Sequence, residues 1–87
     1  MNYIYNSCLI RNKFFMAIKH IKTQLEKIPK TSGIYQFFDE KENVLYVGKA
    51  KNLLKRITSY TQENRLSDRI ARMVFLAKKV EIIQTTN

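Results

Sequence analysis

The sequence has little cysteine and no long apolar run. Its single cysteine, Cys8, has no partner for an internal disulfide and excludes a cysteine-rich zinc site, which favours a reducing, intracellular setting. No run approaches the roughly 20 apolar residues that a membrane-spanning helix needs, and the first ten residues lack the basic leader of a signal peptide. We therefore expect a cytoplasmic protein with no membrane partner.

Acidic residues are also scarce. Asp and Glu number 7 against 16 Lys and Arg, which gives the 87 residues a net charge of +9. This charge favours polyanionic partners such as nucleic acid or acidic lipid headgroups, although small domains that bind no DNA are often basic too. The length suffices for one domain with a thin core, because a fold of this size buries only roughly 60% of the surface that its unfolded chain exposes.

The N-terminal residues give no clear periodic signal. Residues 1–15 are therefore interpreted as an extension of uncertain structure, and residues 16–87 as the domain. From Met16 onward, apolar residues at helical spacing predict an amphipathic helix that Pro29 ends. These apolar residues are Ile18, Ile21, Leu25 and Ile28. His20 lies on the polar side, so we expect a solvated histidine rather than a ligand.

The remaining elements alternate between strand and helix patterns. Residues 33–38 are rich in β-branched and aromatic side chains, the polar residues 39–43 predict a turn, and residues 44–47 predict the returning strand of a β-hairpin. Amphipathic patterns predict helices over residues 52–61 and 66–78, and a third strand covers 80–85. The predicted fold class is a small α+β domain, with a three-stranded, mainly antiparallel sheet flanked by helices.

A group of cations and phenols follows the second strand. Lys49, Arg56 and Tyr60 lie 3, 10 and 14 positions after Tyr46. On a helix, Arg56 and Tyr60 are one turn apart, and Lys49 lies two turns back along the same stripe. Two cations and a phenol beside Tyr46 would suit a phosphate, and Gly48 would leave room for close backbone approach. The alternative is an ordinary hairpin and surface helix, with the tyrosines packing the sheet.

Two tripeptides carry a family resemblance. Residues 33–35 (GIY) and 46–48 (YVG), whose tyrosines are eleven positions apart, are similar to the paired signature of GIY-YIG nucleases. The run YVGKAKNL over residues 46–53, continued by Lys55-Arg56 and Ser59-Tyr60, resembles the UvrC branch, as does Ile28-Pro29 ahead of residues 32–35. The resemblance covers about residues 17–87 and implies a GIY-YIG fold, with Gly33 and Gly48 as the motif glycines.

The resemblance also implies roles for the site residues. Tyr46 would be the general base that deprotonates water, assisted by Lys49, while Tyr35, Arg56 and Tyr60 would bind and polarise the scissile phosphate. A free phenol has a pKa near 10, so its anion costs about 4 kcal/mol at neutral pH. Neighbouring cations lower this cost, and in the family a divalent cation, Mg²⁺ or Mn²⁺, shares the task.

Further basic residues after the second strand are expected to contact DNA. They are Lys51, Lys55, Arg65, Arg69 and Arg72. In the family, the metal-binding glutamate lies on a helix after the third strand, and we expect this ligand to be missing here because the sequence has no residue at that position. We expect the acidic residues of the hairpin turn and third strand to be solvated charges rather than substitutes for it. These residues are Asp39, Glu40, Glu42 and Glu81.

Three functions remain open. The first is the N-terminal domain of a UvrC-type excinuclease, which acts in nucleotide excision repair with other subunits such as UvrB and cleaves 3′ to a DNA lesion. Without the metal ligand, we expect this chain to be inactive by itself. The second is a DNA-binding module that has lost catalysis, and the third is a protein-interaction domain with a basic surface. Metal-dependent nicking separates the first from the others, and the salt dependence of DNA binding separates the second from the third.

Overall fold

The computed structural model describes residues 8–62 and 66–86 as a small α+β domain. The elements are α1 (Cys8–Gln24), the 3₁₀ helix η2 (Leu25–Lys27), β1 (Gly33–Phe38), β2 (Val44–Ala50), α2 (Leu53–Ser59), α3 (Asp68–Leu76) and β3 (Lys79–Gln84). This confirms the predicted fold class and order of elements. Among the described helices, none is both long and apolar enough to cross a membrane.

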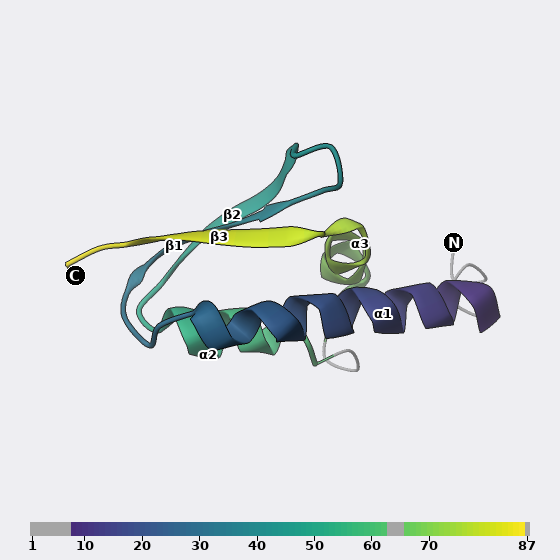
Figure 1. Ribbon diagram of the computed structural model, residues 1–87, viewed down its shortest axis with the longest axis horizontal. Helices are drawn as coiled ribbons and strands as arrows, with labels where there is room; N and C mark the ends of the chain where they lie inside the picture. The colour runs from purple at the N-terminus through teal and green to yellow at the C-terminus, as the bar shows by residue number, and fades with distance from the viewer. Residues whose placement is uncertain (1–7, 63–65, 87) are drawn as a thin grey trace.

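The three strands form one antiparallel sheet in the order β2-β1-β3. Figure 1 shows α1 running along one side of this sheet, with α2 behind it in this view and α3 near the start of β3. On the central strand, Gly33, Tyr35 and Phe37 are buried and the residues between them are half-buried. Because successive side chains of a strand point to opposite faces, the buried set is the face that the helices cover.

The core lies between this face and the helices. Its largest fully buried side chains are Phe37, Ile21, Leu53, Ile57 and Val74, which come from β1, α1, α2 and α3. The opposite face of the sheet is more open, with Val47 and Ile83 more than half exposed. The sheet therefore has one packed face and one solvent-facing face, and the packed face is the one that positions the candidate site.

Helix α1 requires a correction to the predicted start of the first helix at Met16. It begins at Cys8, so the boundary at residue 16 falls inside the helix, while residues 1–7 lie outside the described residues. The physical reason is the burial of Phe14, which is only 8% exposed and joins Ala17, Ile18 and Ile21 on one helical stripe. Residues 8–15 thus form the first part of α1.

Polar contacts tie α1 to the start of β3. His20 is exposed, as predicted, but it is not merely solvated: its Nε2–H donates a hydrogen bond to the carbonyl oxygen of Lys78 at 2.5 Å. One turn later, Oε1 of Gln24 accepts a hydrogen bond from the backbone N–H of Val80 at 3.0 Å. These two side chains fix the helix against a strand that lies far away in the sequence.

Phe14 offers a test of whether the first part of α1 belongs to the packed domain. We expect Phe14→Ala to lower the free energy of unfolding by about 3 kcal/mol, because it removes a buried aromatic ring and leaves a cavity. Its neighbour Phe15 is 53% exposed, so Phe15→Ala should lower stability by less than about 1 kcal/mol. Urea unfolding followed by circular dichroism measures both values. Equal losses would show that residues 8–15 do not belong to the core helix.

Candidate active site

Three tyrosines from three elements meet on the packed face. Tyr35 lies on β1, Tyr46 on β2, and Tyr60 caps the C-terminus of α2. The ring centroids of Tyr35 and Tyr46 are 6.2 Å apart, and the ring of Tyr60 lies 5.9 Å from Tyr35 and 6.2 Å from Tyr46. We refer to Tyr35, Tyr46 and Tyr60 as the tyrosine cluster.

The strand register and helix α2 assemble this cluster. In the β1–β2 pair, Gly48 faces Tyr35 and Tyr46 faces Phe37, so the side chains of both tyrosines lie on one face. Helix α2 begins where Oδ1 of Asn52 accepts the backbone N–H of Lys55 at 3.0 Å, which is a typical N-cap. The fully buried Leu53 and Ile57 then hold the helix against the sheet and bring Tyr60 to the cluster.

The three phenols differ in exposure and in bonding. The hydroxyls of Tyr35 and Tyr60 share a hydrogen bond of 2.7 Å, and these residues are only 3% and 7% exposed. Burial, together with this hydrogen bond, raises the pKa of Tyr60 far above its ordinary value, so Tyr60 remains a neutral phenol. Tyr46 is 37% exposed and is the member of the cluster that solvent water reaches.

Phe37 supports the cluster and was missed as a site residue in the sequence. It is fully buried and meets Tyr35 and Tyr60 edge-on, with centroid distances of 6.0 and 5.2 Å. Such edge-to-face contacts are favourable and directional, so Phe37 fixes the orientation of both buried phenols. The signal was present in the alternation along β1, which places Phe37 on the same face as Tyr35.

The motif glycines are explained by packing. A Cβ atom at Gly48 would lie 2.5 Å from Cζ of Tyr35 and would also overlap its hydroxyl oxygen. The space beside Gly48 is therefore filled by a phenol, whereas the sequence suggested a space for backbone approach. At Gly33, a Cβ atom would overlap the carbonyl oxygen of Ile83 and lie 2.8 Å from Cδ1 of Leu53.

Lys49 does not follow the helical stripe predicted for it. It belongs to β2, which continues to Ala50, and it pairs with Ile34. A strand alternates with a period of two, so the side chain of Lys49 leaves the sheet on the face opposite Tyr46. The helical-spacing argument was wrong for this residue because the helix begins only at Leu53.

Arg56 lies one turn before Tyr60 and lines a basic pocket of about 360 Å³ next to α2. The residues that line this basic pocket are Ala50, Lys51, Asn52, Lys55, Arg56 and Ser59. Within residues 8–62 and 66–86, none of its three cations forms an ion pair. Two predicted DNA contacts, Lys51 and Lys55, are thus gathered here.

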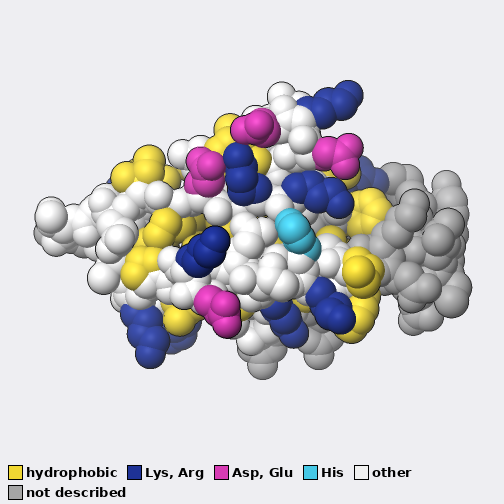
Figure 2. Space-filling view, in the orientation of Figure 1, with side chains coloured by type: hydrophobic (Ala, Val, Ile, Leu, Met, Phe, Trp, Pro, Cys, Tyr) yellow, Lys and Arg dark blue, Asp and Glu magenta, His cyan; other side chains and the backbone are white. Residues whose placement is uncertain are grey.

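The other predicted DNA contacts lie elsewhere. Arg69 and Arg72 are exposed on α3, which does not contribute to the basic pocket, and Arg65 lies outside the described residues. Figure 2 shows Lys and Arg side chains distributed over one face of the molecule, with acidic side chains between them. The basic pocket is therefore a local concentration of positive charge on a generally basic surface.

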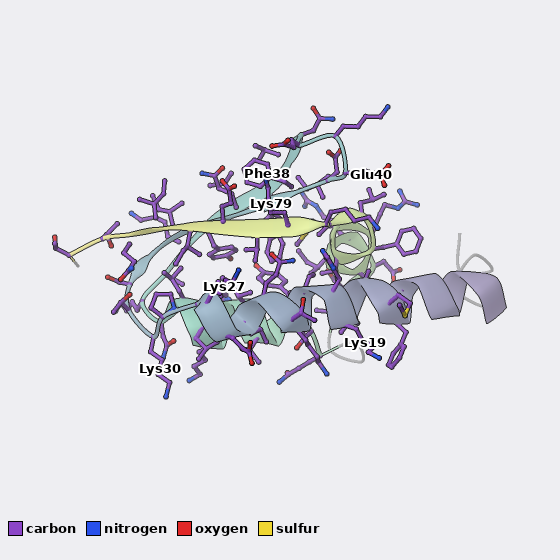
Figure 3. All side chains as sticks on the ribbon, in the orientation of Figure 1. Lys19, Lys27, Lys30, Phe38, Glu40 and Lys79 are labelled. Atoms are coloured by element: carbon purple, nitrogen blue, oxygen red, sulfur yellow. The ribbon has the colours of Figure 1, made fainter. Side chains whose placement is uncertain are left out.

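Three of the described carboxylates are held by contacts away from the tyrosine cluster. On the open face, Lys79 pairs with Glu42 at 3.2 Å and with Glu81 at 3.3 Å. Figure 3 shows Lys79 close to Phe38, and the ammonium group lies 5.0 Å from the centre of that ring. These contacts give Glu42 and Glu81 a structural role, so neither is positioned to hold a metal beside the cluster.

The hairpin turn accounts for another carboxylate. Oδ1 of Asp39 accepts the backbone N–H groups of Lys41 and Asn43 at 2.9 and 2.8 Å. The hydrogen bond from Asn43 is the main reason that the pKa of Asp39 lies below its ordinary value. Among the described residues, no group of three or more His, Cys, Asp or Glu side chains is arranged to hold a metal ion.

Comparison with known proteins places this geometry in a family. Residues 31–87 match the UvrC-like GIY-YIG domain. The UvrABC system protein C of Neisseria gonorrhoeae is 55% identical over 62 residues, covering 71% of this chain and 10% of that protein. The Wolbachia protein of the same name is 42% identical over 74 residues, covering 85% and 12%. The chain thus spans about a tenth of the length of these curated relatives.

Solved structures agree with the sequence matches. The N-terminal GIY-YIG endonuclease domain of UvrC from Thermotoga maritima, bound to its catalytic magnesium, has a TM-score of 0.66 and is 30% identical. The match covers 77% of this chain and 72% of that one. Three variants of the Thermotoga domain, each with a tyrosine replaced by phenylalanine, also bind the catalytic divalent cation. By sequence and by fold, this chain belongs to the UvrC-like GIY-YIG family.

Proposed function

We propose that this chain is the nuclease domain of a UvrC-type excinuclease and takes part in hydrolysing a DNA phosphodiester. The tyrosine cluster is the observation that carries this proposal. It joins three phenols from β1, β2 and the end of α2, of which Tyr46 alone is substantially open to solvent. A single accessible phenol packed against two buried phenols fits a site in which the accessible group transfers a proton and the two buried groups fix the position of that accessible group.

The proposed roles follow from exposure and bonding. Tyr46, as its phenolate, accepts a proton from the water that attacks phosphorus while one P–O ester bond breaks. The neutral Tyr60 and its partner Tyr35 fix the position of the Tyr46 ring. Arg56, exposed on α2, binds the negatively charged phosphate oxygens. The side chain of Lys49 leaves β2 on the face of the sheet opposite Tyr46. Because β2 is an edge strand, Lys49 assists Tyr46 only by reaching around that edge.

A catalytic divalent cation is bound by the Thermotoga domain. Such an ion prefers several oxygen ligands, chiefly carboxylates and water. The carboxylates of Asp39, Glu42 and Glu81 are held in the hairpin turn and on the open face of the sheet. The described residues therefore do not fit a metal site beside the tyrosine cluster, and the proposal gives no step to a metal held by them, whether Mg²⁺ or Mn²⁺.

The wider role is proposed from the relatives. UvrABC system protein C is named as part of a multi-subunit system, so we propose damaged duplex DNA as the substrate and other excinuclease subunits, UvrB among them, as partners. Incision 3′ to a lesion, nucleotide excision repair as part of the SOS response, and a cytoplasmic location belong to the same proposal.

A second candidate is a DNA-binding module that does not cleave. The observation that favours it is the combination of a basic pocket with the lack of a carboxylate group at the tyrosine cluster among the described residues. Both candidates require DNA binding, and only the first requires chemistry.

Nicking of a lesion-containing duplex in the presence of Mg²⁺ separates them. We expect the chain to bind this duplex with an affinity that falls steeply with salt, by a slope of about 0.9 per neutralised phosphate on a log-log plot. Metal-dependent nicking in the same samples supports the nuclease. Salt-sensitive binding without nicking supports the second candidate, and binding that salt does not weaken contradicts both.

A further inference from the structure

The basic pocket is separate from the tyrosine cluster. None of the three tyrosines lines it, and the one proposed catalytic residue that does is Arg56. Lys51 and Lys55, on either side of the α2 N-cap, supply two further cations. A phosphate bound at the tyrosines would therefore leave this concave, positively charged surface empty.

Among the described residues, no protein group accepts from the donors of the pocket. Within the described part of the chain, the cationic groups of Lys51, Lys55 and Arg56 have no hydrogen-bond acceptor or ion-pair partner. The amide oxygen of Asn52 is committed to the α2 N-cap, which leaves its NH₂ group as a fourth unused donor. The Ser59 hydroxyl donates to the carbonyl oxygen of Arg56 at 2.5 Å and so contributes to the wall rather than to binding.

The chemistry of the lining selects an anion. Three cations and an amide donor with no acidic residue among the lining residues match a phosphodiester, whose oxygens are all acceptors. The volume of about 360 Å³ exceeds what a single small ion requires and accommodates a phosphate with part of its sugar. Because α2 carries both Arg56 and Tyr60, a strand lying along this helix would present consecutive phosphates to the pocket and to the tyrosine cluster.

We infer that the basic pocket binds a DNA backbone phosphate next to the one that is cut, with Lys51, Lys55 and the amide of Asn52 as its contacts. The inference rests on the proposed function for its choice of DNA as the polyanion. It assigns to the pocket the task of holding the strand in register, so that the phosphate one step along reaches Tyr46.

The test is a salt titration of duplex binding by the chain and two variants. Lys51→Ala/Lys55→Ala removes two charges from the pocket, and Lys22→Ala/Lys41→Ala removes two exposed charges that do not line it. We expect the pocket variant to lose affinity about tenfold and to reduce the log-log salt slope by about one, because a phosphate contact disappears. The control variant should retain the slope of the parent chain.

Several outcomes would overturn the inference. Equal losses in the two variants would mean that only total charge matters, and undiminished binding by the pocket variant, or no DNA binding by the parent chain, would rule out the contact. Binding to vesicles of anionic phospholipid that depends on Lys51 and Lys55 and exceeds DNA binding would assign the pocket to a lipid surface. Circular dichroism of both variants verifies that they are folded.

The inference and the proposed function can fail separately. In a Tyr46→Phe background the pocket should still bind DNA with the parent slope, since Tyr46 does not line it. Pocket-dependent binding without any nicking would support the contact between the pocket and a backbone phosphate and would favour the DNA-binding module that does not cleave. If the pocket variant still nicks DNA and its salt slope is unchanged, the nuclease proposal stands and the inference about the pocket is refuted.

Discussion

Replacing Tyr46 by phenylalanine is expected to reduce DNA cleavage by about 10²- to 10⁴-fold, the usual contribution of a positioned general base. Stability should change by less than about 0.5 kcal/mol, because Tyr46 is 37% exposed and the phenylalanine ring keeps its contacts with Tyr35 and Tyr60. DNA binding should remain. The measurement is the single-turnover nicking rate of the Neisseria gonorrhoeae UvrABC system protein C that carries the matching segment of this chain in place of its own.

Tyr35→Phe is the matched comparison for that experiment. It also removes one hydroxyl, but it leaves the buried Tyr60 hydroxyl without its partner at 2.7 Å. An unsatisfied buried hydroxyl costs about 1–3 kcal/mol of stability. Tyr46→Phe should therefore lower the cleavage rate, whereas Tyr35→Phe should lower the free energy of unfolding. A Tyr46→Phe variant that nicks DNA at the parent rate would remove Tyr46 from the role of base.

Gly48→Ala is expected to destabilise the domain by about 2 kcal/mol and to disrupt the tyrosine cluster. The added methyl group would lie 2.5 Å from Cζ of Tyr35, and overpacking of this kind typically costs about 1–3 kcal/mol. To relieve the overlap, the Tyr35 ring must move, and its hydrogen bond to Tyr60 is then lost. Urea unfolding measures the stability, and near-ultraviolet circular dichroism of the tyrosines reports the displaced rings.

The double variant Gly48→Ala/Tyr35→Leu distinguishes this explanation from a simple loss of backbone freedom. A leucine side chain is shorter than a tyrosine side chain and leaves room for the added methyl group. Gly48→Ala should therefore lower the free energy of unfolding less in the Tyr35→Leu background than in the parent. Additive losses would show that the two sites do not interact. Val47→Ala, at an exposed neighbouring position on β2, should have little effect.

The order of elements was predictable because the amphipathic periods are distinct along most of the chain. The alternation over residues 33–38 and the helical stripes of α2 and α3 correspond to real buried faces. The start of α1 was not predictable, because one buried aromatic, Phe14, among the mixed polar and apolar residues before Met16 gives too weak a period. The start of α1 depends on long-range contacts of this helix with α3 and β3, and the local sequence carries no signal of such contacts.

The candidate site was predictable in composition but only partly in geometry. Residue types and spacing identified Tyr46 and Tyr60, and the family resemblance added Tyr35. The sheet register and helix α2 bring all three together. The position of Lys49 depends on where β2 ends and α2 begins, and a shift of a few residues in that boundary reverses the face of the side chain. The Tyr35–Tyr60 hydrogen bond and the packing at Gly48 required coordinates, since neither has a sequence signature.

The tyrosine cluster is drawn from one short stretch of chain, and this has a kinetic consequence. Tyr35 and Tyr60 are 25 positions apart, whereas the side-chain bond between Thr31 and Gln84, which fastens β3 beside β1, spans 53 positions. Short loops close at a smaller entropic penalty and more rapidly than long ones. The part of the domain that carries the tyrosine cluster is therefore local in the chain and can assemble early during synthesis, before the long-range contacts of β3 close.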